Sequence, residues 1–182
     1  MADVTTLKQA VAESGPYAVW GLMDEDERRA AATALWQNSD RETRIALEQT
    51  LAKEMKFRPQ SIHRLALDRV VGRLVHLAED APENLLFQYL FHLHMADRRP
   101  LLGEFLDGAG IPHEDGVLDL PEDFPGADAA KVGQAAAALV AAHGHAALVY
   151  LATLKVADKD FWNGLDEVLG AYTPDGTAVG AS

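Results

Sequence analysis

Residues 128–157 read DAAKVGQAAAALVAAHGHAALVYLATLKVA, and their pattern is that of two consecutive helices. Asp128 is a typical N-cap residue, and the alanine-rich run behind it predicts a helix that ends at His143. Gly144 suits a left-handed C-terminal cap, so a second, buried helix is predicted over residues 145–156. Together these signals predict a tightly packed antiparallel helical hairpin that turns at Gly144.

A membrane span is the alternative interpretation of this stretch. Residues 132–154 carry no charge over 23 positions, which is long enough to cross a bilayer. Much of the run is alanine, however, and His143 and His145 would lie in the hydrocarbon near its middle. A soluble helical hairpin is the better interpretation, and we expect no membrane association.

Helical patterns also dominate the rest of the chain, whereas the alternating patterns of strands are scarce. Residues 61–78 have the pattern of an amphipathic helix, and residues 85–96 are apolar on nearly all sides, as in a buried helix. Residues 111–126 contain three prolines and two glycines and predict a long ordered loop. The predicted fold is all-α, a single-domain bundle of about eight to ten helices.

The best internal boundary is the FRP sequence at residues 57–59, because a proline drives the residue before it out of helical geometry. We therefore expect an N-terminal helical annex over residues 1–57, with its first helix from about residue 4 to residue 13. A main helical domain is expected over residues 58–172. The small and polar residues 173–182 predict a flexible tail.

Charge is spread unevenly along the 182 residues, which have a formal net charge of −12 and no cysteine. Residues 41–73 are net positive, at +4, whereas residues 74–182 carry −12. The overall excess of acid argues against nucleic acid as a partner, since phosphate affinity comes from clustered Lys and Arg. The absence of cysteine excludes thiolate chemistry. The first residues contain no apolar segment of the secretory type, so we expect a cytoplasmic protein.

Several catalytic motifs are absent from the sequence. The zinc-protease pattern HExxH does not occur, and neither does the Glu-x-x-His pattern of di-iron helical bundles. The glycine-rich sequences that hold nucleotide phosphates are also missing, as is the GxSxG nucleophile turn. The chain therefore carries no recognisable signature of these enzyme classes.

Seven histidines make imidazole the natural metal ligand to consider. His92 and His94 would point ~200° apart on one helix, so they cannot chelate a single ion together. The His113-Glu114-Asp115 loop places an imidazole and two carboxylates on one turn, which suits acid–base chemistry or a hard cation. The alternative is a simple Asp-Gly turn with solvated acids, and histidines that only pack or cap helices. The candidate metal ligands are His94, His113, Glu114, His143 and His145.

A second candidate site is a stripe of three basic side chains. Arg69, Arg73 and His76 are spaced i, i+4 and i+7, which aligns them on one side of a helix. Arg58 and Arg64 belong to the same basic window. Such a stripe can hold a phosphate, a carboxylate or an acidic peptide. The alternative is that these bases pair with the acidic C-terminal part of the same chain.

These observations favour a soluble helical interaction or small-ligand-binding module over an enzyme. We expect a protein partner or self-association, and no bound cofactor. Trp20 and Trp36 would add to an interaction surface if they were exposed. The alternative is a metal-dependent enzyme, built on the histidines and the His113-Glu114-Asp115 loop, with a divalent metal as its cofactor.

Overall fold

The computed structural model describes residues 5–180. Within these residues the chain forms eleven α-helices, one 3-10 helix and one small two-stranded sheet, so the all-α prediction is confirmed. Internal contacts divide the chain into two compact units. We call Asp24–Asp97 the central unit, and Met1–Met23 with Arg98–Ser182 the terminal unit.

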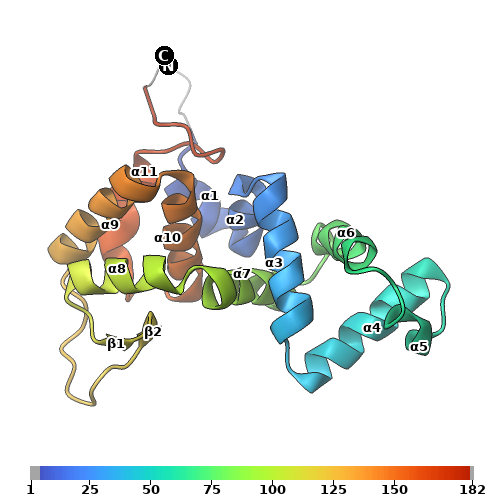
Figure 1. The fold of residues 1–182 in the computed structure, drawn as a ribbon. Helices are drawn as coiled ribbons and strands as arrows, with labels where there is room; N and C mark the ends of the chain where they lie inside the picture. The colour runs from blue at the N-terminus through green and yellow to red at the C-terminus, as the bar shows by residue number, and fades with distance from the viewer. Residues whose placement is uncertain (1–4, 181–182) are drawn as a thin grey trace. The chain divides into compact units, whose positions relative to one another are not determined.

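The central unit is built from helices only. They are α3 (Glu25–Asn38), α4 (Arg41–Met55), α5 (Pro59–Ile62), α6 (Leu67–Ala78) and α7 (Glu83–Asp97). Helix α3 packs against α6 and α7, and the short α5 packs against α4 (Figure 1). Helix α3 begins at Asp24, which forms a reciprocal capping box with Glu27.

The helix predicted over residues 61–78 is shorter than its apolar pattern suggested. Lys56 ends α4 in the left-handed conformation, at φ 56° and ψ 39°. Pro59 then starts the one-turn helix α5, which includes Ser61 and Ile62. Residues 63–66 connect α5 to α6, so α6 begins only at Leu67. The boundary predicted at Phe57 lies between α4 and α5, inside the central unit.

The core of the central unit lies under α6 and α7. Val70, Val71 and Leu74 face inward from α6, as the amphipathic pattern predicts, whereas Leu67 is 43% exposed. The hydroxyl of Tyr89 on α7 is buried and donates a hydrogen bond of 2.9 Å to the carbonyl oxygen of Leu74. Burial raises the pKa of Tyr89 well above its ordinary value, so the phenol remains a donor.

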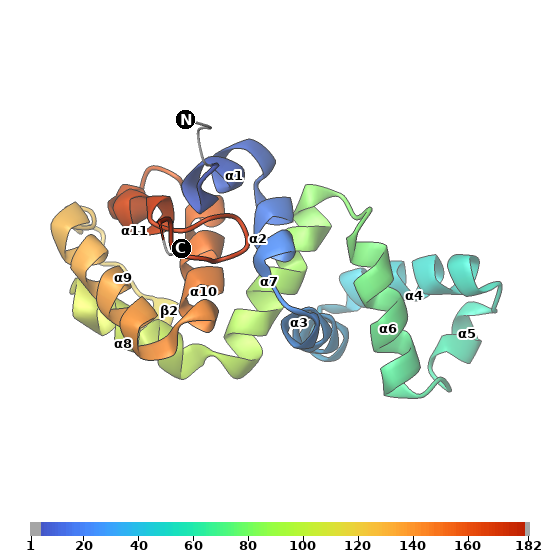
Figure 2. The same ribbon diagram turned by 90° about the horizontal axis from the view of Figure 1, so that it is seen from above.

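The terminal unit combines helices from both ends of the chain (Figure 2). Its elements are α1 (Leu7–Ser14), α2 (Pro16–Leu22), α8 (Arg99–Ala109), strands β1 (His113–Glu114) and β2 (Val117–Leu118), α9 (Ala129–His143), α10 (His145–Ala157), the 3-10 helix η1 (Asn163–Leu165) and α11 (Asp166–Gly170). Helix α9 packs against α8, η1 and α10, and α10 also contacts α1 and α2. Phe105 is 1% exposed, and its ring contacts those of Tyr150 and Trp162.

The helical hairpin predicted at Gly144 is present as α9 and α10. Asp128 accepts hydrogen bonds from the first turn of α9, at 3.0 Å from the Ala130 amide and 3.2 Å from the Lys131 amide. Gly144 has φ 58° and ψ −125°, which lies outside the left-handed helical region expected for it. Among residues 5–180, no helix has both the length and the hydropathy that crossing a bilayer requires.

The loop predicted over residues 111–126 contains a tight hairpin. Strands β1 and β2 pair antiparallel, with His113 opposite Leu118. Asp115 and Gly116 both have positive φ, at 50° and 79°, as a type I′ turn requires. The strands have only two residues each, which is too short for an alternating pattern to show in the sequence.

The first and the last described segments of the chain meet in the terminal unit, where the Leu7 amide donates a hydrogen bond of 2.7 Å to the Tyr172 carbonyl oxygen. The helix predicted from residue 4 begins at Leu7, after a capping box formed by Thr6; residue 4 itself lies outside the described residues. In the tail predicted over residues 173–182, Ala178 forms an isolated β-bridge with Tyr172, and residues 181 and 182 are not described.

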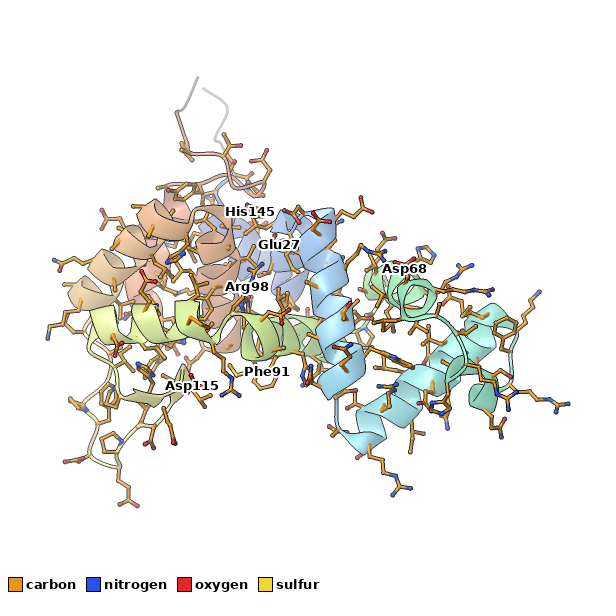
Figure 3. All side chains as sticks on the ribbon, viewed as in Figure 1. Glu27, Asp68, Phe91, Arg98, Asp115 and His145 are labelled. Carbon is orange, nitrogen blue, oxygen red and sulfur yellow. The ribbon has the colours of Figure 1, made fainter. Side chains whose placement is uncertain are left out.

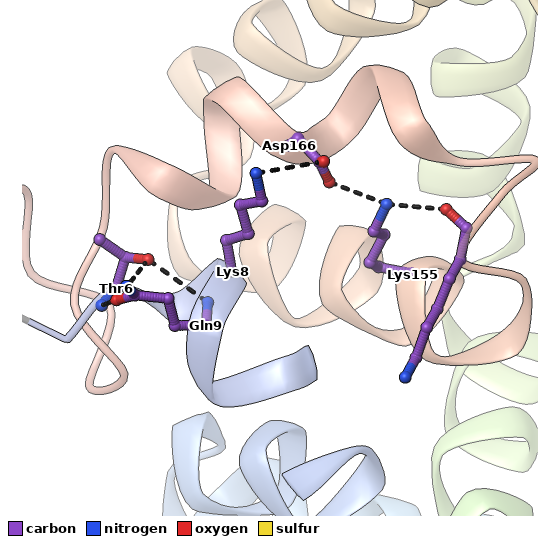
Figure 4. A network of polar contacts seen from close by, with 6 residues as sticks. Thr6, Lys8, Gln9, Lys155 and Asp166 are labelled. Carbon is purple, nitrogen blue, oxygen red and sulfur yellow. Dashed lines mark hydrogen bonds and ion pairs between the residues drawn. The ribbon is translucent and has the colours of Figure 1, made fainter. Parts of the chain in front are cut away.

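An ion-pair network ties three helices of the terminal unit together (Figure 4). The carboxylate of Asp166 at the start of α11 lies 2.8 Å from the Lys155 ammonium on α10 and 3.3 Å from the Lys8 ammonium on α1. Lys155 also donates to the carbonyl oxygen of Lys159, at 2.7 Å. Partial burial by itself would raise the pKa of Asp166, but the two lysines outweigh it and hold the pKa below its ordinary value.

We expect Asp166→Asn to destabilise the terminal unit at neutral pH by about 1 kcal/mol, because both lysines lose their carboxylate. The Asp166 carboxyl has a lower pKa in the folded chain, so its contribution is complete above the unfolded pKa. That contribution is lost as the pH falls through the folded pKa. Urea unfolding of both proteins at pH 7 and near pH 3 measures the difference, and a difference that is the same at both pH values would contradict this assignment.

Candidate functional site

The most distinctive surface of the central unit is a group of basic and apolar side chains between α4 and the start of α6. Residues 56–73 contain five Lys or Arg residues and a single acid, Asp68. The carboxylate of Asp68, on α6 in Figure 3, is paired with Arg29 of α3. The only acid of the segment is therefore already neutralised from another helix.

Two apolar side chains are exposed among these bases. Phe57 is 38% exposed and Leu67 is 43% exposed. The guanidinium carbon of Arg69 lies 5.5 Å from the centre of the Phe57 ring, which brings the first turn of α6 against the α4–α5 connection. The basic side chains of this surface therefore lie next to apolar side chains that are exposed to solvent.

Four of the bases remain without a carboxylate. Among the described interactions, none pairs Lys56, Arg58, Arg64 or Arg69 with an acidic side chain, and all four are exposed. We call these four bases with their two apolar neighbours the basic patch. Its members are Lys56, Phe57, Arg58, Arg64, Leu67 and Arg69.

The three residues of the predicted stripe have different surroundings. Arg69 belongs to the basic patch. Arg73 lies 3.9 Å from Glu54 on α4, and His76 lies 3.6 Å from Glu79. Intramolecular pairing thus applies to two of the three residues, and their partners are acids of the central unit rather than of the C-terminal part. All three residues lie on α6, and the partner of Arg73 on α4 depends on the tertiary structure.

His113 of the predicted metal and acid–base cluster holds the hairpin in place. Its Nδ1 accepts a hydrogen bond from the Gly116 amide at 3.1 Å. Its Nε2 lies 3.0 Å from the Asp107 carboxylate on α8. The neutral ring has one acceptor and one donor nitrogen, and both are used here. His113 therefore has no free nitrogen for a proton relay or a metal.

The other carboxylates of this loop have separate surroundings. Asp115, labelled in Figure 3, pairs with Arg99 at 3.0 Å. Glu114 and Asp119 are exposed and line a hollow of about 400 Å³, together with Val117 and Leu118. Arg99 and Asp115 form the remaining wall of the hollow. The hollow suits a cationic group with an apolar stem more than a bare ion.

The remaining candidate metal ligands belong to different units. His94 is 2% exposed on α7 of the central unit. His143 and His145 lie in the terminal unit, and the imidazole of His143 is 2.7 Å from the Glu104 carboxylate. Among the described residues, neither unit by itself contains a group of three His, Asp or Glu side chains with ligand atoms within 4.8 Å of one another.

We expect chelation to leave the stability of the protein unchanged, because the described polar contacts of His113 and His143 are to groups of the protein itself. The midpoint of thermal unfolding should stay within about 1 °C after treatment with a strong chelator, whereas a structural metal would be lost with a clear drop. Elemental mass spectrometry of the untagged protein measures how many metal ions are bound per chain. A stoichiometric metal, with a lower midpoint after chelation, would restore the metal-dependent alternative.

An acidic cleft of about 640 Å³ lies between α4 and the connection from α6 to α7. Asp40, Glu42 and Asp80 line it, and no Lys, Arg or His side chain does. The Asp40 carboxylate is the N-cap of α4: it accepts from the Thr43 amide at 2.8 Å and from the Thr43 hydroxyl at 3.2 Å. These bonds, the backbone one foremost, hold the pKa of Asp40 below its ordinary value. Asp40 therefore has a structural role that accounts for its position.

Fold and site together define an all-α protein whose candidate site is a charged surface. Comparison of the chain with protein-family models, with curated proteins and with solved structures finds no match. Trp20 and Trp36 do not contribute to an exposed surface, since they are 6% and 7% exposed. Phe57 and Leu67 are the members of the site that sequence reasoning missed. Their apolar character alone predicts burial, and exposure becomes visible only in the folded chain.

Proposed function

We propose that this chain is a helical interaction module that binds an acidic protein partner through the basic patch. The observation that carries the proposal is the set of four exposed bases without carboxylates, in a chain with a net charge of −12. A chain with so many acids has ample means to neutralise these bases internally. A partner protein with exposed carboxylates would provide the ion pairs that these four bases do not form within the chain.

The apolar members of the patch favour a protein partner over a nucleic acid. Phe57 and Leu67 gain from contact with apolar side chains, which remove their exposed area from water. A polyanion would have to approach a central unit that holds 13 acids against 10 bases. Such a field slows and weakens the approach of phosphate chains but leaves short-range pairing with a local acidic group intact.

The test uses a labelled peptide of alternating glutamate and leucine, and fluorescence anisotropy of the complex with the full chain. Reversing two patch charges, Arg58→Glu with Arg64→Glu, should weaken binding about 30-fold, at roughly 1 kcal/mol for each reversed contact. Raising the salt from about 50 to 500 mM should weaken the wild-type complex as well, because exposed charges are screened.

A matched control separates the patch from net charge. Arg41→Glu with Lys131→Glu changes the total charge by the same amount, and both residues are exposed outside the patch. This control should keep its affinity within about twofold of wild type, a difference of less than 0.5 kcal/mol. Equal losses in the two double variants would show that the peptide responds to overall charge, and the proposal would then fail.

A further inference from the structure

The hairpin of the terminal unit is a surface with the opposite charge and a similar apolar centre. Val117, Leu118 and Leu120 are 38–42% exposed and lie within residues 117–120. Glu114 precedes them and Asp119 lies between Leu118 and Leu120, and neither carboxylate has a described partner. We call these five residues the acidic hairpin. Exposed apolar side chains this close together are typical of an interaction surface.

Four anchors hold this surface in a fixed shape. Both ring nitrogens of His113 are bonded, and Arg99 holds the turn through Asp115. A Cβ at Gly116 would lie 2.9 Å from the Arg99 carbonyl oxygen, so the turn sits directly on α8. Farther along the loop, the ring of Phe124 lies 6.4 Å from that of Phe161. A surface that is ordered in advance loses less entropy when it binds.

The hollow in this hairpin matches an arginine side chain in its chemistry. Asp115 already neutralises Arg99, which leaves Glu114 and Asp119 to receive a guanidinium. Val117 and Leu118 provide apolar walls for the aliphatic stem of the incoming side chain. The basic patch also combines charged and apolar side chains, but its charges, including those of Arg58 and Arg64, are positive where those of the hairpin are negative.

We propose that the acidic partner of the basic patch is the acidic hairpin of a second copy of this chain. The inference rests on the proposed function and names its partner. Each copy carries one patch on its central unit and one hairpin on its terminal unit, so each contact joins two different surfaces. A single contact leaves one patch and one hairpin free. These two can pair with each other and close a dimer, or each can bind a further copy.

Sedimentation velocity of the full chain tests the self-association. The weight-average mass should rise with concentration from about 5 to 200 µM at low salt, the range in which small transient interfaces form. It should return toward the monomer near 500 mM salt. Two variants each remove one surface. The first is Arg58→Glu with Arg64→Glu, and the second is Glu114→Gln with Leu118→Ser and Asp119→Asn.

Each variant alone should remain a monomer over the whole range, because all five altered side chains are exposed and either the patch or the hairpin is lost. An equimolar mixture should form a heterodimer and stop there, because one intact hairpin meets one intact patch. The control Arg41→Glu with Lys131→Glu should associate like wild type. Thermal unfolding of all variants near the wild-type midpoint confirms that they are folded.

Three outcomes would overturn the inference. A monomer at every concentration would do so, and the peptide experiment would then still show whether the patch binds acidic segments. Association that survives in both surface variants would place the contact elsewhere on the chain. A mixture that stays monomeric, when wild type associates, would exclude the patch–hairpin pair. Loss of peptide binding and of self-association together would remove the proposed function as well.

Discussion

Gly164→Ala is expected to lower the free energy of unfolding of the terminal unit by about 3 kcal/mol, the upper end of the range for overpacking. Gly164 lies in η1, where this short helix crosses the start of α9. An added Cβ would lie 2.6 Å from the carbonyl oxygen of Ala129 and 2.9 Å from the Cβ of Val132. The first of these atoms belongs to the backbone of a helix, so it cannot yield by a rotamer change.

Gly170→Ala is the matched control, since Gly170 ends the neighbouring helix α11 and a Cβ there would meet nothing within 4 Å. This substitution should be neutral or stabilise by up to about 1 kcal/mol, because alanine favours the helical backbone. Urea unfolding of the three proteins measures both effects. Equal destabilisation by the two alanines would show that η1 does not approach α9 as closely as described.

Leu74→Ala is expected to reduce stability and Leu67→Ala to reduce binding, although both residues lie on α6. Leu74 is fully buried, so its truncation should cost about 3 kcal/mol of central-unit stability through lost transfer energy and a cavity. Leu67 is 43% exposed, so its truncation should cost at most about 0.5 kcal/mol. Chemical unfolding of each variant, followed by fluorescence or circular dichroism, measures these values.

Binding should reverse that order. Leu67→Ala removes apolar area from the basic patch and should weaken the acidic peptide several-fold, at about 25 cal/mol for each Å² no longer covered. Leu74→Ala should leave the affinity of the folded fraction unchanged. If a Leu67→Ala variant binds like wild type, Leu67 does not contribute to binding. The proposed function would then rest on the charged residues of the patch.

The partners of the charged side chains show how far sequence reasoning reaches. Arg69, Arg73 and His76 follow from helical spacing, yet Arg73 finds Glu54 on α4 and Arg69 finds the Phe57 ring. His143 pairs with Glu104, which is 39 positions away in the chain. Spacing within one helix predicts which residues share a side. It says nothing about the helix that lies opposite, because this depends on packing between distant segments.

Local sequence by itself determined the all-α class, the helix pair around Gly144, the cap at Asp128 and the Asp-Gly turn at residues 115–116. Each depends on hydrogen bonds and periodicity within a few residues, and these do not depend on how distant segments pack. The tertiary structure alone decided which bases stay unpaired and which apolar side chains stay exposed. Burial and ion pairing join residues far apart in sequence, so only the packing of the helices determines which surfaces remain exposed.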